Sequence, residues 1–262
     1  MRKTEPGLLH SAPVTYCLAM RLEEGLVFLS DTRTNAGVDD VGVYRKLHVF
    51  HPAPDRLLVL QSAGNLATTQ EVLDRLAADL AAGDGRGSLA TVEHLFEAAL
   101  YVGRLGTEVT DAHRAALGSG ASATFIIGGQ IGEAPPDILL VYPEGNYIRA
   151  SDDRPFLQIG ESKYGKFMLD VAVMAHGDLV TSTKIALGSM MSTARANLSV
   201  GPPYDAGVYR TGTFALDEHR FTADSPVLGE LREVWERSIV SALAELPDIE
   251  LTALSDETAA PA

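Results

Sequence analysis

Residues 15–30 read TYCLAMRLEEGLVFLS, and this stretch establishes which class of fold to expect. Two short apolar segments, Thr15–Met20 and Leu26–Ser30, flank the turn sequence Glu23-Glu24-Gly25. Apolar runs of this length, separated by a polar turn that ends in glycine, are typical of a β-hairpin. The sequence therefore predicts two antiparallel strands, the first of which begins at Thr15.

Two more strands are expected soon after this hairpin. Tyr44–Phe50 alternates between apolar and polar residues, and Leu57–Gln61 is continuously apolar. Four strands within about 50 residues favour one antiparallel sheet, because parallel strands need long crossover connections. Helical spacing follows at Asn65–Ala82, which Gly83 should end.

The rest of the chain continues in groups of helices and strands. The remaining predicted elements are a helix from Ser88 to about Leu117, which Gly103–Gly106 could break; strands at Ala121–Ile127, Ile138–Tyr142, Tyr147–Ala150 and Phe156–Ile159; helices at Ser162–His176 and Leu179–Leu198; strands at Val208–Arg210 and Phe214–Phe221; and a terminal helix at Leu228–Leu246. Groups of strands followed by groups of helices favour an α+β fold over strict βαβ alternation. Two antiparallel sheets packed face to face, with a helix pair outside each, would bury every apolar face.

Composition excludes several classes of function. The chain has 262 residues, of which 46% are hydrophobic and 21% charged, so it is globular. Its net charge of −14 disfavours nucleic-acid and anionic-membrane partners. Cys17 is its single cysteine, so an internal disulfide is impossible. Because the sequence contains no apolar run long enough for a membrane span or a secretory signal, we expect a cytoplasmic protein.

Five short motifs occur in a fixed order along the chain. They are TYC from Thr15, SDTRTNAG from Ser30, RKLHVF from Arg45, SAGNLATTQ from Ser62 and QIGESKYGK from Gln158. In this order they resemble the proteasome β-type peptidases and, more narrowly, the bacterial Anbu ("ancestral β-subunit") group. The resemblance extends from Thr15 to about Leu246. It implies a four-layer αββα sandwich and an N-terminal-nucleophile threonine peptidase.

The resemblance also implies catalytic roles, and each suits the residue type. Thr15 would be the nucleophile, with its own free α-amine as the base. The positive charge of Lys46 would disfavour protonation of that amine and stabilise the developing oxyanion. Asp31 would hold Lys46 in place. The backbone N–H of Gly64 would donate to the oxyanion. Ser162 would support the amine and the hydrolytic water.

Further family positions fall on Ser199 and on a substrate pocket. Ser199 matches a serine of the catalytic network, and the pocket residues would be Thr34, Ser62, Leu66 and Gln70. These pocket residues are mostly small or polar, so no strong aromatic or basic preference is expected. The resemblance implies no cofactor. His48 and His51 have no third ligand nearby in the sequence, so no metal is expected either.

The chain departs from the family pattern at three places. Val14 precedes the nucleophile where proteasome subunits usually have glycine. The spacing from Asp31 to Lys46 is one residue shorter than in standard β-subunits, although it suits the Anbu-like group. Ala196 follows Arg195 where the family places an aspartate. Loss of that aspartate weakens the network around the amine, so we expect a slow or selective peptidase.

Residues 1–14 leave three hypotheses open. Translation could begin at codon 14, since GTG encodes valine and also serves as a bacterial start codon. The segment could instead be a propeptide removed by autocatalysis. It could also be retained, which would block the amine of Thr15. We expect one peptidase domain over residues 15–246 and an acidic, frayed tail over residues 247–262.

Three functions are compatible with this sequence. The first is a threonine peptidase that cleaves peptides or unfolded proteins within a homo-oligomer, arranged as a ring or an open helical ring. In it, the helix at Asn65–Ala82 and the one after it are candidate contact faces. The second is a catalytically silent assembly of the same fold. The third is a small-molecule amidase with the same type of nucleophile. The sequence identifies no ATPase partner.

Overall fold

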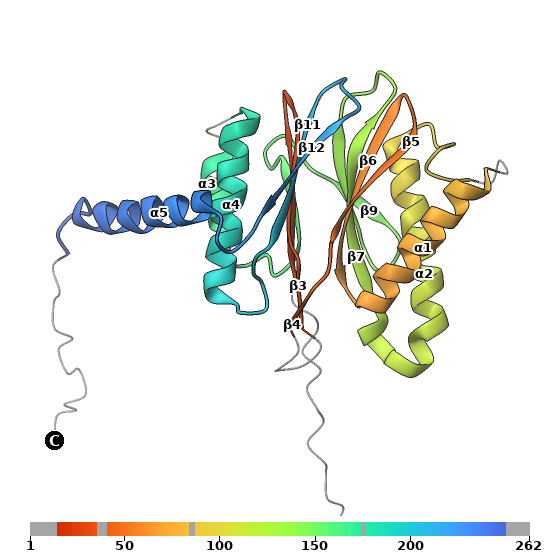
Figure 1. Ribbon diagram of the computed structural model, residues 1–262, viewed down its shortest axis with the longest axis horizontal. Coiled ribbons are helices and arrows are strands. Elements are labelled where there is room, and N and C mark those ends of the chain that lie inside the picture. The colour runs from red at the N-terminus through yellow and green to blue at the C-terminus, as the bar shows by residue number, and fades with distance from the viewer. Residues whose placement is uncertain (1–14, 36–40, 84–86, 174–176, 250–262) are drawn as a thin grey trace, which may run out of the picture.

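The computed structural model describes residues 15–35, 41–83, 87–173 and 177–249. Its centre is a pair of antiparallel five-stranded sheets that face one another (Figure 1). The first sheet has the order β10-β1-β2-β11-β12. Its strands are β10 (Phe156–Gly160), β1 (Tyr16–Leu22), β2 (Gly25–Asp31), β11 (Tyr204–Arg210) and β12 (Leu216–Phe221). The predicted hairpin is therefore confirmed, with Leu22 paired to Gly25 at its turn.

The second sheet has the order β5-β6-β7-β8-β9. Its strands are β5 (Leu47–Ala53), β6 (Arg56–Gly64), β7 (Ala123–Ile131), β8 (Asp137–Val141) and β9 (Tyr147–Arg149). The expectation that the first four predicted strands share one sheet is wrong, because β1 and β2 lie in one sheet and β5 and β6 in the other. The chain between them forms two short paired strands, β3 (Arg33–Asn35) and β4 (Val41–Val43). Strands of three residues are too short for a periodic pattern to reveal.

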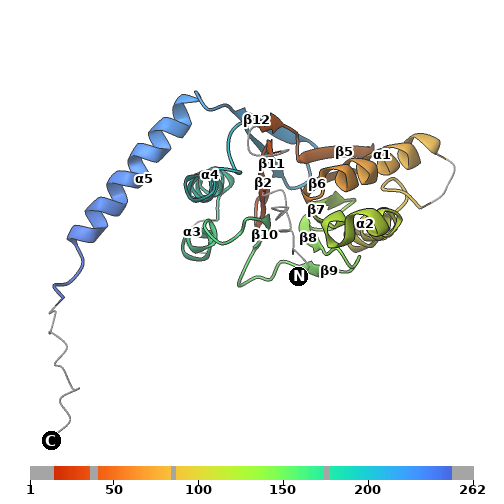
Figure 2. The same ribbon diagram turned by 90° about the horizontal axis from the view of Figure 1, so that it is seen from below.

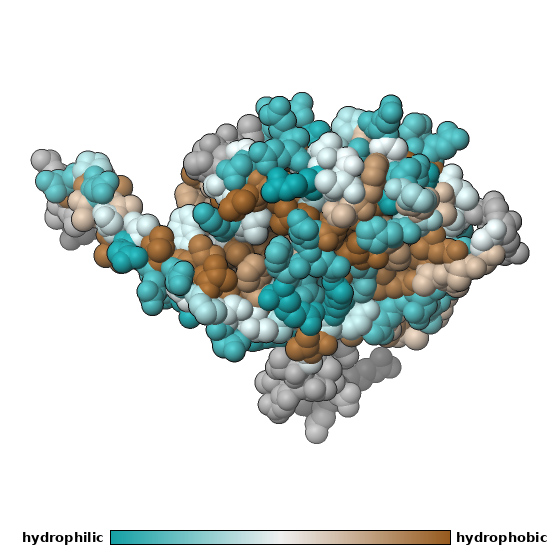
Figure 3. All heavy atoms as spheres, turned by 45° about the horizontal axis from the view of Figure 1, so that its top comes forward, coloured by the Kyte–Doolittle hydropathy of each residue, from teal (hydrophilic) through white to brown (hydrophobic). Residues whose placement is uncertain are grey.

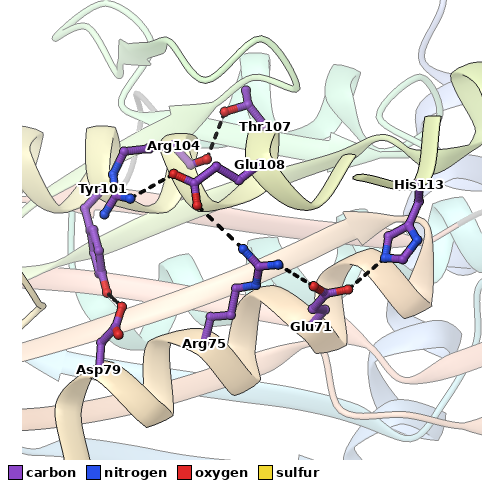
Figure 4. A network of polar contacts seen from close by, with 8 residues as sticks. All are labelled: Glu71, Arg75, Asp79, Tyr101, Arg104, Thr107, Glu108 and His113. Carbon is purple, nitrogen blue, oxygen red and sulfur yellow. Dashed lines mark hydrogen bonds and ion pairs between the residues drawn. The ribbon is translucent and has the colours of Figure 1, made fainter. Parts of the chain in front are cut away.

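Helices cover the outer faces of both sheets (Figure 2). Next to the second sheet lie α1 (Leu66–Ala82) and α2 (Leu95–Leu117), and next to the first lie α3 (Lys166–Ala172) and α4 (Leu179–Ala196). Together these layers confirm the α+β, four-layer αββα arrangement. Polar contacts on their outer side join α1 to α2, including the hydrogen bond of Glu71 with His113 and the ion pair of Arg75 with Glu108 (Figure 4).

The terminal helix α5 (Pro226–Ala244) does not complete a layer. It leaves the body beside α4 and runs away from both sheets (Figures 1 and 2). Among its residues only Leu228 is fully buried. The expectation that helix pairs would bury every apolar face is therefore wrong for this helix.

The helix α2 is continuous through Gly103 and Gly106, so the break considered there is absent. A side chain at Gly103 would come within 2.2 Å of the Gly145 carbonyl oxygen. The glycine therefore allows a loop to approach the helix closely, while the flanking residues keep helical geometry. This helix begins at Leu95 and not at Ser88, because residues 88–94 form turns that precede the helix.

Three apolar clusters fill the spaces between the four layers. One lies between α3–α4 and the first sheet, one between the sheets, and one between the second sheet and α1–α2. Strand β1 contributes to two of them, because alternate side chains point to opposite faces. Tyr16 and Leu18 face α4, and Cys17 and Ala19 face the second sheet. Thr15 continues the second series, which directs it toward the space between the two sheets.

Candidate active site

Thr15, Asp31 and Lys46 meet at one end of the first sheet. The Thr15 hydroxyl donates to Oδ1 of Asp31 at 3.0 Å. The Lys46 ammonium donates to the same oxygen at 2.7 Å, and the Tyr16 backbone N–H does so at 3.0 Å. One carboxylate oxygen thus holds both the hydroxyl and the lysine. The structure brings together the three residues that the motifs singled out first.

The pairing of β1 with β2 and the start of β5 explain how these three residues meet. Cys17 pairs with Ser30 across the first hairpin, which puts Thr15 beside Asp31 at the end of β2. Lys46 directly precedes β5, in the second sheet, and its ammonium also donates to the Arg33 carbonyl at 2.7 Å. That second contact fixes the lysine between the two sheets. The backbone therefore dictates the geometry of the site.

The Asp31–Lys46 pair is almost entirely removed from water. Asp31 is fully buried, and Lys46 is 5% exposed. Burial raises the pKa of the Asp31 carboxyl, and the Lys46 ammonium together with the Tyr16 and Thr15 donors opposes that rise. Oδ2 of Asp31 has no hydrogen-bond partner among the described residues. The charge of Asp31 thus depends on the contacts at its other oxygen.

Thr15 is held from its other side by the end of β10. Glu161 donates its backbone N–H to the Thr15 carbonyl at 2.7 Å. Gly160 has a φ of +82°, and a Cβ atom there would lie 1.9 Å from the Thr15 carbonyl oxygen. A glycine is therefore required where β10 passes Thr15. This contact leaves the Thr15 side chain on the Asp31 side.

The backbone N–H of Gly64 faces the side of β6 on which Lys46 lies. Ser62 donates its N–H to the Lys46 carbonyl at 3.1 Å, and Asn65 donates in the opposite direction, to the Ser122 carbonyl at 3.0 Å. Amides alternate between the two edges of a strand, so the amide of Gly64 points to the same edge as that of Ser62. Because β5 begins at Leu47, which pairs with Gln61, no β5 residue lies opposite Gly64.

Neither of the two predicted serines has a hydroxyl that is hydrogen-bonded to Thr15, Asp31 or Lys46 among the described residues. Ser162 follows the clamp formed by Gly160 and Glu161, and its backbone N–H donates to the Gly160 carbonyl at 3.0 Å. Ser199 donates its backbone N–H to the Asn197 side chain at 3.0 Å. Their catalytic roles stay predictions.

Glu161 and Asn197 form a contact that the motifs did not reveal. The Asn197 side-chain amide donates to the Glu161 carboxylate at 3.2 Å, which ties the end of α4 to the strand that holds Thr15. Asn197 directly follows Ala196, the position at which the family places its aspartate. No periodicity or charge pattern marks Glu161, although it lies inside the QIGESKYGK motif.

The four predicted pocket residues lie on elements that adjoin the site. Ser62 is a buried residue of β6, and Leu66 begins α1 directly after it. Gln70 lies one turn further along α1, with its side chain beside the Tyr44 hydroxyl. Thr34 belongs to β3 and pairs with Gly42. They flank Gly64 and Lys46 in the chain, but their contact with a substrate stays a prediction.

The buried Asp31 carboxylate accepts from the Thr15 hydroxyl and from the Lys46 ammonium at the same oxygen. The edge of β6 on which Lys46 lies leaves the Gly64 amide without a strand opposite it. Among the described residues, no cluster of three or more histidine, cysteine, aspartate or glutamate side chains is placed to bind a metal ion. In the same part of the chain, no helix has the length and hydropathy needed to cross a bilayer.

Comparison with solved structures gives strong matches along nearly the whole chain. Anbu (ancestral β-subunit) from Yersinia bercovieri is 41% identical, with a TM-score of 0.84, over 90% of this chain and 100% of that one. Anbu from Hyphomicrobium sp. strain MC1 is 40% identical, with a TM-score of 0.83 and the same coverage.

A third match is described as the helical assembly of the Anbu complex from Pseudomonas aeruginosa. It is 40% identical, with a TM-score of 0.84, over 90% of this chain and 98% of that one. No protein-family model matches the chain, and no curated protein sequence does so at the significance required.

Proposed function

This chain belongs to the Anbu family of ancestral β-subunits, and from that premise we propose that it is a threonine peptidase acting as a homo-oligomer. The observation that carries the proposal is the contact of the Thr15 hydroxyl with Asp31, which also holds Lys46. The proteasome-like fold supports a place among hydrolases. The helical assembly of the Pseudomonas relative supports association between copies of this chain.

The first step is attack by the Thr15 hydroxyl on a peptide carbonyl. A bond forms between Oγ and the carbonyl carbon, and the hydroxyl proton passes to the free α-amine of Thr15. An unperturbed α-amine has a pKa of about 7.7–8.0, so much of it is neutral near pH 7.5. The carbonyl oxygen becomes an oxyanion, which the amide of Gly64 stabilises. Lys46 disfavours a second positive charge nearby and so favours the neutral amine.

The second half of the reaction returns the enzyme to its starting state. Collapse of the tetrahedral intermediate breaks the peptide C–N bond, and the α-ammonium gives its proton to the departing amine. Thr15 then carries the remaining acyl group as an ester. A water molecule attacks that ester while the α-amine accepts a proton from the water. The amine returns this proton to Oγ as the acid product leaves.

This mechanism needs a chain whose first residue is Thr15. A peptide bond to Val14 converts the α-amine into an amide, which cannot accept the proton. Residues 1–14 lie outside the described residues, so the three hypotheses about them stay open. A retained segment would make the silent assembly the better description.

The proposed substrates are peptides or unfolded proteins. Thr34, Ser62, Leu66 and Gln70 would line the pocket for the side chain next to the cleaved bond. These residues are small, polar or aliphatic and carry no charge. We therefore expect no strong preference for aromatic or basic side chains.

Covalent trapping tests the peptidase directly. A peptide epoxyketone reacts with the hydroxyl and the amine of an N-terminal threonine together. Intact mass spectrometry of a chain that starts at Thr15 should show one adduct per chain, and Thr15→Ala should show none. A chain that retains residues 1–14 should also show none, whereas one that removes them by autocatalysis should show the adduct on Thr15. Absence of an adduct on assembled protein that starts at Thr15 overturns the peptidase proposal.

Substrate size separates the peptidase from a small-molecule amidase. A peptidase of this kind should cleave unfolded protein and be assembled beyond a dimer in solution. Hydrolysis confined to small amides by a monomer or dimer would favour the amidase.

A further inference from the structure

The space between the two sheets is filled mainly by apolar side chains, and Gln61 is an exception. The side chains that meet there come mostly from leucine, isoleucine, valine, alanine and phenylalanine. Gln61 belongs to β6, where the alternate residues Val59 and Ala63 point into this space, so its side chain points there too. Gln61 has no exposed surface. Hydrophilic residues are spread over the face of the protein shown in Figure 3, and a surface of this kind is where glutamine is usually found.

The amide of Gln61 reaches across to the first sheet. Its Nε2 donates to the carbonyl of Leu29, in β2, at 2.9 Å. Leu29 lies two residues before Asp31, and Gln61 lies three residues before Gly64. The apolar contacts around this bond are non-directional, whereas a hydrogen bond fixes both a distance and an angle. This bond therefore sets the separation of the two sheets next to the candidate active site.

The residue after Gln61 makes two further contacts to the site. Ser62 donates its backbone N–H to the Lys46 carbonyl at 3.1 Å. Its own carbonyl accepts from the Sγ of Cys17, in β1, at 3.7 Å. Cys17 lies two residues after Thr15. Together with the bond to β2, these contacts tie this end of β6 to each of the three segments that carry the site.

An amide is an unfavourable choice for this position if stability alone matters. Oε1 of Gln61 is buried and has no hydrogen-bond partner among the described residues. The Leu29 carbonyl belongs to the β1–β2 ladder, in which Leu29 pairs with Leu18. Burying an amide costs stability unless each of its polar atoms is paired, and an apolar side chain of the same length carries no such cost. A polar residue at such a position is expected where geometry matters more than stability.

The Gly64 amide is the group whose place this bond controls. A donor stabilises an oxyanion best at roughly 2.7–3.1 Å, and an error of about 1 Å can cost about 10²-fold in rate. The strand β6 runs without interruption from Gln61 to Gly64 and is paired with β7 over this whole length. A shift of β6 at Gln61 would therefore move the Gly64 amide relative to Thr15.

We propose that Gln61 is a positioning residue for the reaction of Thr15. By holding β6 to β2, it sets the separation between the Gly64 amide and the Thr15 hydroxyl. The carbonyl of a substrate would lie between these two groups during attack, so their separation affects the rate of the chemical step more than the binding of the substrate. The inference rests on the proposed function and adds to it a residue that does not touch the reacting atoms.

A second glutamine between the sheets provides a matched control. Gln130, on β7, is buried, and its Oε1 accepts from the Tyr209 hydroxyl of the first sheet at 2.6 Å. This bond also joins the two sheets, but at the other end of β7, because Gly64 pairs with Ala123 where β7 begins. A substitution of Gln130 leaves the Tyr209 hydroxyl without this acceptor. It should therefore lower stability at least as much as the same substitution of Gln61.

Inactivation kinetics with the peptide epoxyketone test the proposal, on chains that start at Thr15. Gln61→Met should lower the maximal rate of adduct formation by about tenfold or more, and should change the inhibitor concentration at half-maximal rate by less than about twofold. Gln61→Asn keeps an amide on a side chain one methylene shorter and should show the same effect. Gln130→Met should leave both constants within about twofold of those of the natural chain, although it lowers the melting temperature.

Three results would overturn the proposal. The first is a maximal rate in the folded Gln61 variants within about twofold of that of the natural chain. The second is an equal fall in Gln130→Met, which would show that any loosening of the two sheets slows the reaction. The third is failure of both Gln61 variants to fold, because Gln61 would then be needed for the fold itself.

The same measurements separate this inference from the proposed function. If the natural chain that starts at Thr15 forms no adduct, the peptidase proposal fails and this inference fails with it. If the natural chain forms the adduct and the Gln61 variants form it as fast, this inference alone fails. A slow reaction in the Gln61 variants, with a normal one in Gln130→Met, supports both.

Discussion

At the scale of single residues, the site depends on one oxygen atom. Oδ1 of Asp31 accepts hydrogen bonds from a hydroxyl, an ammonium and a backbone amide, and it does so without exposure to solvent. A buried carboxylate is tolerated when its partners compensate the lost hydration. Lys46 is the partner that carries a full opposite charge. Its removal should therefore affect folding as well as chemistry.

Replacing Lys46 by methionine should lower the free energy of unfolding by about 3–5 kcal/mol, because Asp31 is left as an unpaired buried charge. Urea unfolding at pH 7.5 measures this loss. Adding Asp31→Asn should restore part of it. The control is Lys166→Met, which removes a lysine from a partly exposed ion pair with Asp170 and should cost at most about 1 kcal/mol. Equal losses at Lys46 and Lys166 would show that burial of the first pair has no energetic consequence.

At the scale of elements, the end of β10 fixes the position of Thr15. Gly160 permits the strand to pass so close to Thr15 that the backbone of Glu161 reaches the Thr15 carbonyl. The left-handed φ and the close approach both require glycine at this position. A methyl group would push the two strands apart where Thr15 is held.

Gly160→Ala should cost about 2–4 kcal/mol of stability, from strained φ and a clash with backbone. Epoxyketone adduct formation at Thr15 should slow in the same variant. Gly229→Ala is the matched control, since that glycine lies inside α5 with open space around it. There the same substitution should stabilise the chain by about 0.5–1 kcal/mol. Thermal unfolding of both variants measures these changes. A Gly160→Ala variant as stable as the natural chain would contradict the close contact of β10 with Thr15.

The elements also show what local sequence can predict. The strands at Thr15 and Leu26 and the helix at Asn65 were predictable, because apolar period and turn residues act over a few positions. The assignment of β1 and β5 to different sheets was not, because pairing is decided by contacts between distant residues. Asp31 and Lys46 were found through a family resemblance. Glu161 was missed because its contacts to Thr15 and Asn197 use atoms that no pattern marks.

At the scale of the whole molecule, stability should depend on pH through His48. Burial, followed by the positive charge of Arg45, lowers the pKa of His48 to about 4. An unfolded histidine titrates near 6.5, so between these values the unfolded chain binds more protons. Stability is therefore lost as the pH falls from about 6.5 to 4. The loss from this one residue is about 3 kcal/mol.

Urea unfolding of the natural chain and of His48→Gln, at several pH values, measures the effect. The difference in unfolding free energy between the two should shrink by about 3 kcal/mol from pH 7 to pH 4. His51→Gln, at an exposed position of the same strand, serves as the control. A difference that stays constant across this range would show that the fold does not exclude the charged form of His48.

The surroundings of the terminal helix α5 could not be predicted from the sequence. The apolar residues of α5 follow helical spacing, and that spacing does not show that all but Leu228 of this helix stay outside the core. Sequence alone favoured α1 and α2 as contact faces. The structure shows a polar network joining those two helices (Figure 4), with more of the exposed large apolar side chains on α3, α4 and α5.

The way Thr15 is held has a consequence for how such a site can diverge. The amides of Tyr16 and Glu161 and the carbonyl of Arg33 hold the site through main-chain atoms, which every amino acid except proline supplies in full. A substitution at one of these positions keeps its main-chain contact wherever the surrounding packing accepts the new side chain, which is a strict condition at Tyr16, in the core, and a weaker one at Glu161. The contacts that depend on the identity of the residue are then those of Thr15, Asp31, Lys46 and Gly160. The arrangement of atoms at this site is therefore set more by the path of the backbone than by the identity of most residues around it.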